Sequence, residues 1–363
     1  MKFFPSLFQS SPSLYCLRYL TILLLVSSCK NNDFVLNENA VSFSEFPQES
    51  QATFEKVFDF NKGVAFNLHV VDSVLIVFNQ QGGNGHFFYN YNLNSQQLSE
   101  GYLTGGRGPS QAVAAISSGI YGNTLWTYDI SLKKVLTVDK TEAITKANDS
   151  VLSFKEYPVF GSYYTASLKD DDHFLGVGSL SSIYKIQEIN TKTGEETDAF
   201  GVFGHVPNNM DFNAYKSAHQ AFLSVKPTGD KAVLMYRFTD AIEIFDLNTK
   251  EGKAIHGPEN YPVDFKPLNA GDFFVMERTS KTRFAFVAGA VTNQYIYAVY
   301  SGKFNESLHP NYGSFVFVYD WQGNPIKKIT LDREMKSPAV SSDDQTLYAY
   351  DPNTGFVMKT HLN

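Results

Sequence analysis

Cysteine is almost absent from this chain, which has only Cys16 and Cys29 among 363 residues. Small secreted domains that depend on disulfides need several paired cysteines, and cysteine-ligated zinc sites draw on more than one thiolate. Because both cysteines lie close to the N-terminus, the body of the chain has no thiol. A disulfide framework and a cysteine-ligated metal site are therefore excluded there.

The sequence also lacks the spaced motifs of common enzymes. It contains no G-x-S-x-G elbow of a serine hydrolase, and its eight histidines form neither H-x-H nor H-E-x-x-H. The acidic run "DDDH" at 170–173 could pass for metal ligands, but aspartate is also favoured in tight turns, and we predict a turn there. We expect no catalytic residue, no metal ligand and no cofactor.

Positive charge is scarce as well, since the formal net charge is −7 at pH 7. Proteins that bind nucleic acid or anionic lipid headgroups present basic patches, because the phosphate backbone dominates such affinity. Lys2 and Arg18 are the only charged residues before Cys29, so removal of that segment would make the chain still more acidic. Nucleic acid is therefore not expected among the partners.

The N-terminus combines these two basic residues with a short apolar run, "YLTILLLV" at 19–26, and then "SSC". The run is shorter than the roughly 20 residues that a membrane-spanning helix needs, and small residues before a cysteine are typical of a lipoprotein signal. A buried strand with an incidental cysteine is the alternative. The 18 residues before the run are long for such a signal, which favours a start codon further downstream.

We predict three segments from this reading: a lipoprotein signal peptide over 1–28, a lipidated flexible tether over 29–50, and one folded domain over 51–363. Cys29 would carry the lipid and attach the chain to a membrane. The expected location is the bacterial cell envelope, with the lipid in the outer membrane.

The folded part is rich in residues typical of strands and turns, with 31 Phe, 21 Tyr and 25 Gly. Runs of β-forming residues close on a polar residue and a turn, and such hairpins recur at intervals of roughly 54 residues, the size of a four-stranded propeller blade. The five predicted hairpins are "FFYNYNLNSQQL", "KVLTVDKTEAI", "YKIQEINTKTGEE", "AIEIFDLNTKEGKA" and "FVFVYDWQGNPIKKI".

Each hairpin follows a further apolar run, and a sixth unit ends at "GFVMKTHLN" without its outermost strand. The segment 52–60, "ATFEKVFDF", precedes the first unit and could supply that strand, which would remove the two exposed edges of an open array. We therefore predict an all-β fold, a six-bladed β-propeller of four-stranded antiparallel blades, with the last blade closed by an N-terminal strand.

This arrangement resembles the TolB-like six-bladed β-propeller lipoproteins of Gram-negative bacteria. The resemblance covers most of the chain after Cys29 and rests on "VSSC", on "GGRGP", and on the closing pair "VFVYDWQGNPIKKITLD" and "SSDDQTLYAYD". It implies a propeller of the cell envelope, and it brings no catalytic residue with it.

The predicted loops divide into two unequal sets. Connections between the first and second strands of a blade, and between its third and fourth, are predicted to be short, whereas the others include long insertions. Loops longer than about 12 residues are uncommon unless they carry function, so we place a binding site on the long-loop face. The candidate ligand-binding residues there are Arg107, His205, His219 and Arg283.

Arg107 lies in "GGRGPSQ" at 105–111, which looks like a phosphate cradle but lacks the lysine and the hydroxyl residue of a phosphate loop. We predict that its glycines permit a sharp turn and that Pro109 fixes the exit direction. Arg107 would then either anchor the turn on carbonyls or a carboxylate, or contact an anionic ligand.

Three functions remain open at this point. The one that we favour is a non-enzymatic, membrane-anchored propeller that binds a protein, peptide or glycan on the long-loop face. The second is a secreted propeller enzyme, lactonase-like or lyase-like, that acts on a sugar with a divalent metal. The third is a scaffold subunit of an envelope complex.

Overall fold

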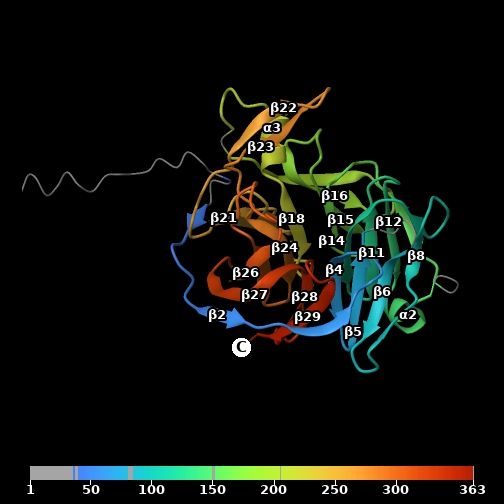
Figure 1. Ribbon diagram of the computed structural model, residues 1–363. Helices are drawn as coiled ribbons and strands as arrows, with labels where there is room; N and C mark the ends of the chain where they lie inside the picture. Colours follow the sequence, from blue (N-terminus) through green and yellow to red (C-terminus); the bar gives the residue numbers. More distant parts are fainter. Residues whose placement is uncertain (1–35, 37–39, 81–84, 149–151, 205, 363) are drawn as a thin grey trace, which may run out of the picture.

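Six antiparallel sheets are arranged in a ring in the computed structural model, which describes residues 36, 40–80, 85–148, 152–204 and 206–362 (Figure 1). The first three blades are successive in the chain. Blade 1 contains β4 (Ala65–Val71), β5 (Val74–Asn79), β6 (His86–Asn92), β7 (Gln97–Leu98), β8 (Tyr102–Gly105) and the short β9 (Gln111–Ala112). Blade 2 contains β10 (Ala115–Tyr121), β11 (Thr124–Asp129), β12 (Lys134–Asp139) and β13 (Lys155–Pro158). Blade 3 contains β14 (Thr165–Leu168), β15 (His173–Val177), β16 (Tyr184–Asn190) and β17 (Glu196–Val202).

The second half of the ring is joined more tightly, because one long strand belongs to two blades. Blade 4 contains β18 (Ala221–Val225), β19 (Lys231–Tyr236), β20 (Ala241–Asp246) and β21 (Gly252–His256). Blade 5 contains β24 (Phe286–Val291), β25 (Tyr295–Tyr300), β26 (Gly313–Asp320) and the first part of β27 (Pro325–Val340). Blade 6 contains the last part of β27, β28 (Thr346–Asp351), β29 (Phe356–His361) and β3 (Glu55–Asp59).

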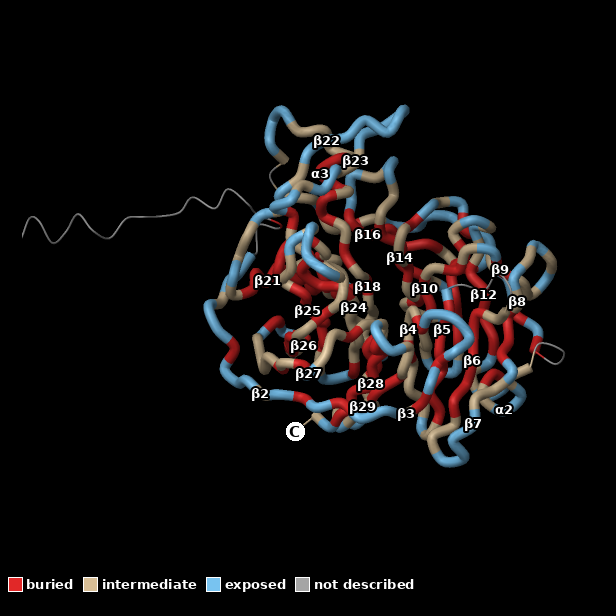
Figure 2. The backbone as a smooth tube through the Cα atoms, viewed as in Figure 1, coloured by how far each residue is buried: buried red, intermediate tan, exposed pale blue. Residues whose placement is uncertain are grey.

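The hydrophobic core lies between the blades. The buried apolar residues form six clusters, and each cluster joins two neighbouring blades around the ring. Strands in the middle of a blade are therefore buried on both faces, which explains continuous apolar runs such as "VLIVFN" in β5. Outer strands such as β13 are largely exposed, as Figure 2 shows for the margin of the ring.

The predicted ring closure is confirmed. β3 pairs antiparallel with β29, with Phe58 opposite Val357, and so provides the fourth strand of blade 6. The ring of Phe58 stacks on that of Tyr91 in blade 1, with centroids 3.9 Å apart. One N-terminal strand therefore completes the last sheet and also packs against the first.

The tether predicted over 29–50 needs correction in its described part. β1 (Val41–Ser42) pairs parallel with β21, and β2 (Glu49–Ala52) pairs parallel with β27, so this stretch follows the outside of blades 4 and 5. Leu36 is buried in the cluster between blades 3 and 4, and Phe46 packs against Phe317 and Tyr319. The segment is mostly polar and was therefore predicted to be a flexible tether, but a few apolar side chains pack it against the ring. Cys29 and the predicted signal peptide lie outside the described residues.

The hairpin predicted for "KVLTVDKTEAI" is also wrong in part. After β12 the chain forms the helix α2 (Lys140–Lys146), and the outer strand β13 begins only at Lys155. The Asp139 side chain accepts a hydrogen bond from the Glu142 backbone N–H and caps the helix, while Ala143 packs into the core. The pairing of Asp139 with Glu142 is a capping-box spacing that could have revealed α2 from the sequence. No helix in the described part of the chain is long and apolar enough to cross a membrane.

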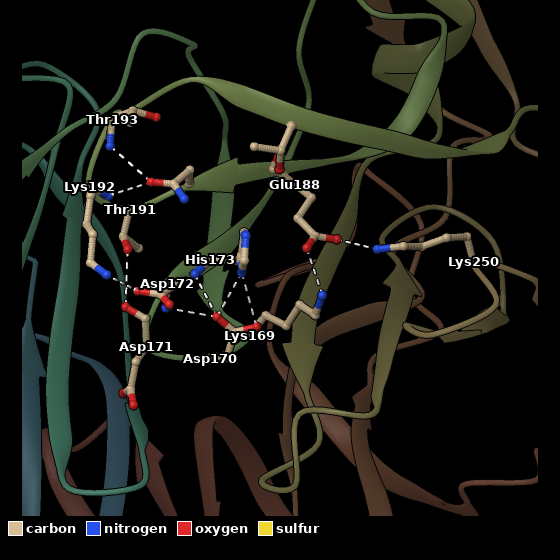
Figure 3. Close-up of polar contacts among 12 residues, drawn as sticks. Lys169, Asp170, Asp171, Asp172, His173, Glu188, Thr191, Lys192, Thr193 and Lys250 are labelled. Atoms are coloured by element: carbon tan, nitrogen blue, oxygen red, sulfur yellow. Dashed lines mark hydrogen bonds and ion pairs between the residues drawn. The ribbon is translucent and has the colours of Figure 1, made fainter.

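The acidic run at 170–173 forms the predicted turn, between β14 and β15 (Figure 3). Asp170 accepts hydrogen bonds from the backbone N–H groups of Asp172, at 2.9 Å, and His173, at 2.8 Å, and also contacts the His173 ring. Asp172 forms an ion pair of 2.6 Å with Lys192 in the neighbouring turn of the same blade. The side chains of Asp170, Asp172 and His173 are thus occupied in contacts within this turn and the neighbouring one.

Beside this turn, Glu188 links two blades. Its buried carboxylate on β16 forms ion pairs with Lys169, at 2.7 Å, and with Lys250 of blade 4 (Figure 3). Burial opposes ionisation of Glu188, but the hydrogen bonds from the two lysines outweigh it and lower its pKa below the ordinary value. The carboxylate therefore stabilises the folded protein in its charged form.

We expect removal of the N-terminal strand to destabilise the whole ring. Deleting 51–60 exposes one edge of blade 6 and one face of blade 1, so the melting temperature of the entire domain should fall in a calorimetric scan. The single change Phe58→Ala should lower the free energy of unfolding by about 3 kcal/mol, because it leaves a cavity beside Tyr91.

Asn61→Ala is the matched control, since Asn61 is exposed directly after the strand. It should melt like the unchanged protein. If the deletion protein kept the original melting temperature, β3 could not be the element that closes the ring.

A second expectation concerns Glu188→Gln. The change leaves Lys169 without its carboxylate partner and leaves Lys250 with only Asp198, at 3.6 Å, and it should lower the free energy of unfolding at pH 7 by about 2 kcal/mol. Because the folded-state pKa of Glu188 is lowered, its contribution is complete above the ordinary pKa of 4.5 and is lost as the pH falls through the folded-state value. The difference between the two proteins should therefore shrink in acid, as measured by urea unfolding across pH.

Glu195→Gln serves as its control, because Glu195 is exposed in a turn of the same blade. A constant difference between Glu188→Gln and the unchanged protein down to low pH would contradict the assignment.

Candidate functional site

The two ends of the ring differ as the loop lengths predict. One end carries the helix α3 (Phe212–Ala218) and the hairpin of β22 (Phe265–Asn269) and β23 (Phe274–Arg278), at the top of Figure 1. The opposite end carries the C-terminus and α2. The long connections 203–220, 257–285 and 301–312 all belong to the first end, which we call the long-loop face.

A cavity of about 140 Å³ opens on this face above blades 3 and 4. Its lining comes from several parts of the chain: Tyr164 before β14, the end of β15 with the loop after it, the start of β16, the segment that contains α3, the end of β19, and Val275 on β23. Aromatic side chains contribute to its lining, together with lysine and histidine. The lining includes Tyr164, Tyr184, Phe203, Lys216, His219 and Tyr236.

The wall on the α3 side is fixed by local hydrogen bonds. Asp211 caps the helix by accepting from the backbone N–H groups of Asn213 and Ala214, at 2.9 and 3.0 Å. From the helix, the Lys216 ammonium donates to the carbonyls of Ser179, Leu180 and Ser182, at 2.7 to 3.1 Å. Burial lowers the pKa of Lys216. This lysine therefore fastens the loop after β15 to the helix across the cavity.

His219 is the one sequence candidate that lines the cavity. It follows α3, its Nδ1 lies 2.8 Å from the Tyr215 carbonyl, and its ring packs against that of Tyr215 at 4.2 Å. Burial lowers the pKa of His219 to about 4, so the ring is neutral at pH 7 and Nδ1–H is the donor to the carbonyl. His219 therefore lines the wall of the cavity with a neutral imidazole ring.

The base of the cavity contains a buried charge pair. Lys185 and Glu243 are 2.7 Å apart, with side chains only 2% and 0% exposed. Glu243 also accepts a hydrogen bond of 2.7 Å from the Tyr236 hydroxyl, and Lys185 donates to the Leu36 carbonyl at 2.8 Å. The pair therefore holds blades 3 and 4 together and ties the N-terminal segment to them, beneath the cavity.

The remaining sequence candidates do not join His219. Arg283, which precedes β24, forms an ion pair with Glu259, donates to the Gly302 carbonyl, and lies 4.3 Å from the Tyr261 ring centroid. Burial opposes its charge, but Glu259 outweighs it and raises the Arg283 pKa. Arg283 therefore fastens loops to each other. His205 lies outside the described residues.

Arg107 is exposed, and within the part of the chain that the structure describes it forms no hydrogen bond or ion pair. Of the two roles left open for Arg107, anchoring of the turn is not seen among the described residues, and Gln111 anchors the turn instead. Gln111 accepts from the Gly108 backbone N–H at 2.8 Å, and a Cβ on Gly106, where φ is +156°, would collide with its side chain. The glycines serve the turn, as predicted, whereas Pro109 and Arg107 are exposed to solvent.

Large apolar side chains are exposed around the cavity and across the same face. Leu180, Ile183, Tyr184 and Val202 lie at its edge, and Ile183 is 60% exposed. Others are on the β22–β23 hairpin and in the loop before β26: Leu268, Phe273, Phe274, Phe304 and Leu308. We call these nine residues the apolar rim. Figure 2 shows the hairpin as an exposed projection of the long-loop face.

Sequence reasoning missed most of these residues, because the cavity is assembled from segments far apart in the chain. The stretch after Asp211, "FNAYKSAH", offered one signal, since an aspartate before a short apolar repeat is a helix start. No group of three or more His, Cys, Asp or Glu side chains that could hold a metal ion occurs within the described ranges.

Comparisons with known proteins agree with this architecture. The family model described as "TolB-like 6-blade propeller-like" matches residues 42–343. A candidate exported protein of Bacteroides fragilis is similar in structure, with a TM-score of 0.57 and 13% identity over 89% of this chain and 99% of that one. The β-propeller domain of Cps50 (Swd1) from Myceliophteria thermophila has a TM-score of 0.48 and 12% identity over 85% of this chain and 100% of its own.

The search of curated proteins gives no match. The family match spans most of the described residues and confirms the resemblance that the sequence motifs suggested. The chain belongs to the TolB-like six-bladed propeller family.

Proposed function

We propose that this chain is a cell-envelope lipoprotein, anchored through Cys29, whose propeller binds a protein or peptide on its long-loop face without catalysing a reaction. The observation that carries the binding proposal is the cavity of about 140 Å³ beside α3. Ligand sites are concave and largely apolar, with a few fixed polar groups, and this lining of aromatic rings with Lys216 and His219 has that character.

The apolar rim favours a protein or peptide over a glycan. A patch of exposed Leu, Ile, Val and Phe side chains is typical of a surface that another protein covers, because its contact with water is unfavourable. Glycans are held mainly through hydrogen bonds and flat aromatic contacts, and the aliphatic members of the rim supply neither. The cavity would accept one side chain of the partner, while the rim would contact the residues around it.

Support for an envelope location comes from two sources. The stretch "VSSC" places small residues directly before Cys29 and after an apolar run, which is the pattern of a lipoprotein signal. The similar Bacteroides fragilis protein is described as a candidate exported protein. An exported propeller with an N-terminal lipid would present its loop face to other envelope components.

A cross-linking experiment tests the binding face. A photo-reactive residue at Ile183, on the apolar rim, should give specific adducts with a protein of the envelope in living cells. The matched site is Glu195, exposed in a turn of the same blade at the opposite end of the ring. Adducts of equal yield at both sites, or none with any protein at Ile183, would count against a protein partner.

The anchor is tested by Cys29→Ser. This change should move the chain from the membrane fraction to the soluble fraction and abolish its partition into detergent, because the lipid supplies the membrane affinity. Cys16→Ser is the matched control and should remain in the membrane fraction, since Cys16 lies in the segment that cleavage removes. Retention of the Cys29→Ser protein in the membrane would overturn the anchor.

A further inference from the structure

Two cations lie at the inner side of the long-loop face, and neither has a carboxylate partner among the residues that the structure describes. Arg237 follows β19 of blade 4, and Lys336 lies in β27 where that strand begins the inner edge of blade 6. The innermost strands of a propeller surround its central channel, so the start of that edge lies at the channel mouth. Both side chains are partly buried.

Arg237 is held in place by aromatic rings. Its guanidinium carbon is 5.4 Å from the ring centroid of Phe222 and 5.6 Å from that of Phe238. Its one side-chain hydrogen bond within the described residues goes to the Gln220 side-chain oxygen, at a long 3.4 Å. Four of the five guanidinium N–H donors are left without an acceptor among the described residues, and the group lies beside the two rings.

Lys336 is in a similar position. Its ammonium lies 5.0 Å from the ring centroid of Tyr312, and no ion pair or hydrogen bond to it occurs among the residues that the structure describes. Some other cations that are wholly or partly buried in the ring have a carboxylate partner, such as Lys185 with Glu243 and Lys303 with Glu334. Lys216 has no carboxylate partner in the described residues but donates to three backbone carbonyls. Among the described residues, Lys336 has neither kind of acceptor, and Arg237 has only the long contact with Gln220.

Packing places the two cations in one region, because Phe238, whose ring lies beside Arg237, and Met335, which directly precedes Lys336, belong to the same buried cluster. Burial lowers the pKa of Lys336, and the charge of Arg237 lowers it further. Burial also lowers the pKa of Arg237, with a further contribution from Arg278 on β23, while the nearby Tyr164 acts in the opposite direction. Arg237 therefore experiences like-charge repulsion from Lys336 and from Arg278, which a bound anion would relieve.

We propose that Arg237 and Lys336 form a binding site for an oxyanion, the carboxylate or phosphate group of a ligand that enters the channel mouth. A planar guanidinium with free donors binds two oxygens of such a group at once, and an ammonium beside it adds a point charge. Removing charged groups from water costs free energy unless they are paired, so the site gains most from an anionic occupant. This site does not depend on occupation of the cavity beside α3.

The test is calorimetric titration of the purified protein with inorganic phosphate and, separately, with succinate at low ionic strength. At least one should bind, with an affinity that falls as sodium chloride is added. Arg237→Gln and Lys336→Met should each weaken binding by about tenfold or more, the loss expected for one charge-assisted hydrogen bond. Lys155→Met, which removes an exposed lysine on the outer strand of blade 2, should bind like the unchanged protein.

The two probes distinguish the sources of the anion. Binding of phosphate alone indicates a phosphate-bearing ligand, and binding of succinate alone indicates a carboxylate-bearing one. If Arg237→Gln lowers the melting temperature, Lys336→Met carries the test, and the NMR-measured pKa of Lys336 should rise when the anion binds. Binding of neither probe, or equal binding by Lys336→Met and Lys155→Met, would overturn the site whatever the outcome of cross-linking at Ile183.

Discussion

The packing of each blade against its two neighbours is the constraint on which the structure depends. A four-stranded sheet with apolar residues on both faces cannot be stable alone, since each face needs a cover. Here six clusters of buried residues supply these covers, one at every contact between blades. The ring must therefore close, and β3 closes it by pairing with β29 while Phe58 packs on Tyr91 of blade 1. The preceding segment extends the same closure, because β1 and β2 add to the outside of blades 4 and 5.

Closure also explains where the loops can vary. The inner strands are fixed by neighbours on both sides, so insertions are tolerated only at the ends of the ring. The largest insertions, α3 and the β22–β23 hairpin, pack together above blades 3 and 4 and create the cavity between them. The position of α3 is set in part by polar contacts, such as the Lys216 hydrogen bonds to the loop after β15. Because the apolar core lies between the blades, the strands of the ring are constrained while the loops at its ends can differ in length.

The sequence predicted the ring well and the site poorly, and the reason is the range of the interactions involved. The number of blades and the ring closure could be predicted from local patterns that recur along the chain. The apolar residues of each strand indicate its burial, and the last repeat visibly lacks its fourth strand. The cavity depends on the meeting of Leu180, Lys216 and Val275, which share no motif. Arg107 attracted attention because of its glycines, yet those glycines serve contacts with Gln111. The packing of residues 40–50 against the ring was missed for a similar reason. Phe43 and Phe46 are held by contacts with Tyr319, which is far away in the sequence.

The distribution of charge separates residues that hold the ring from those available to a ligand. Glu188 joins Lys169 and Lys250 across two blades, and Glu243 joins Lys185 between the same two, so in both cases the cost of burying charge is offset within the protein. Arg237 and Lys336 have no carboxylate partner among the described residues, so the cost of burying their charge is not offset in the same way. A neutral side chain at either position would remove the repulsion between them. Partly buried like charges at a channel mouth therefore lower the stability of the free protein, and this cost is recovered only when an anion is bound.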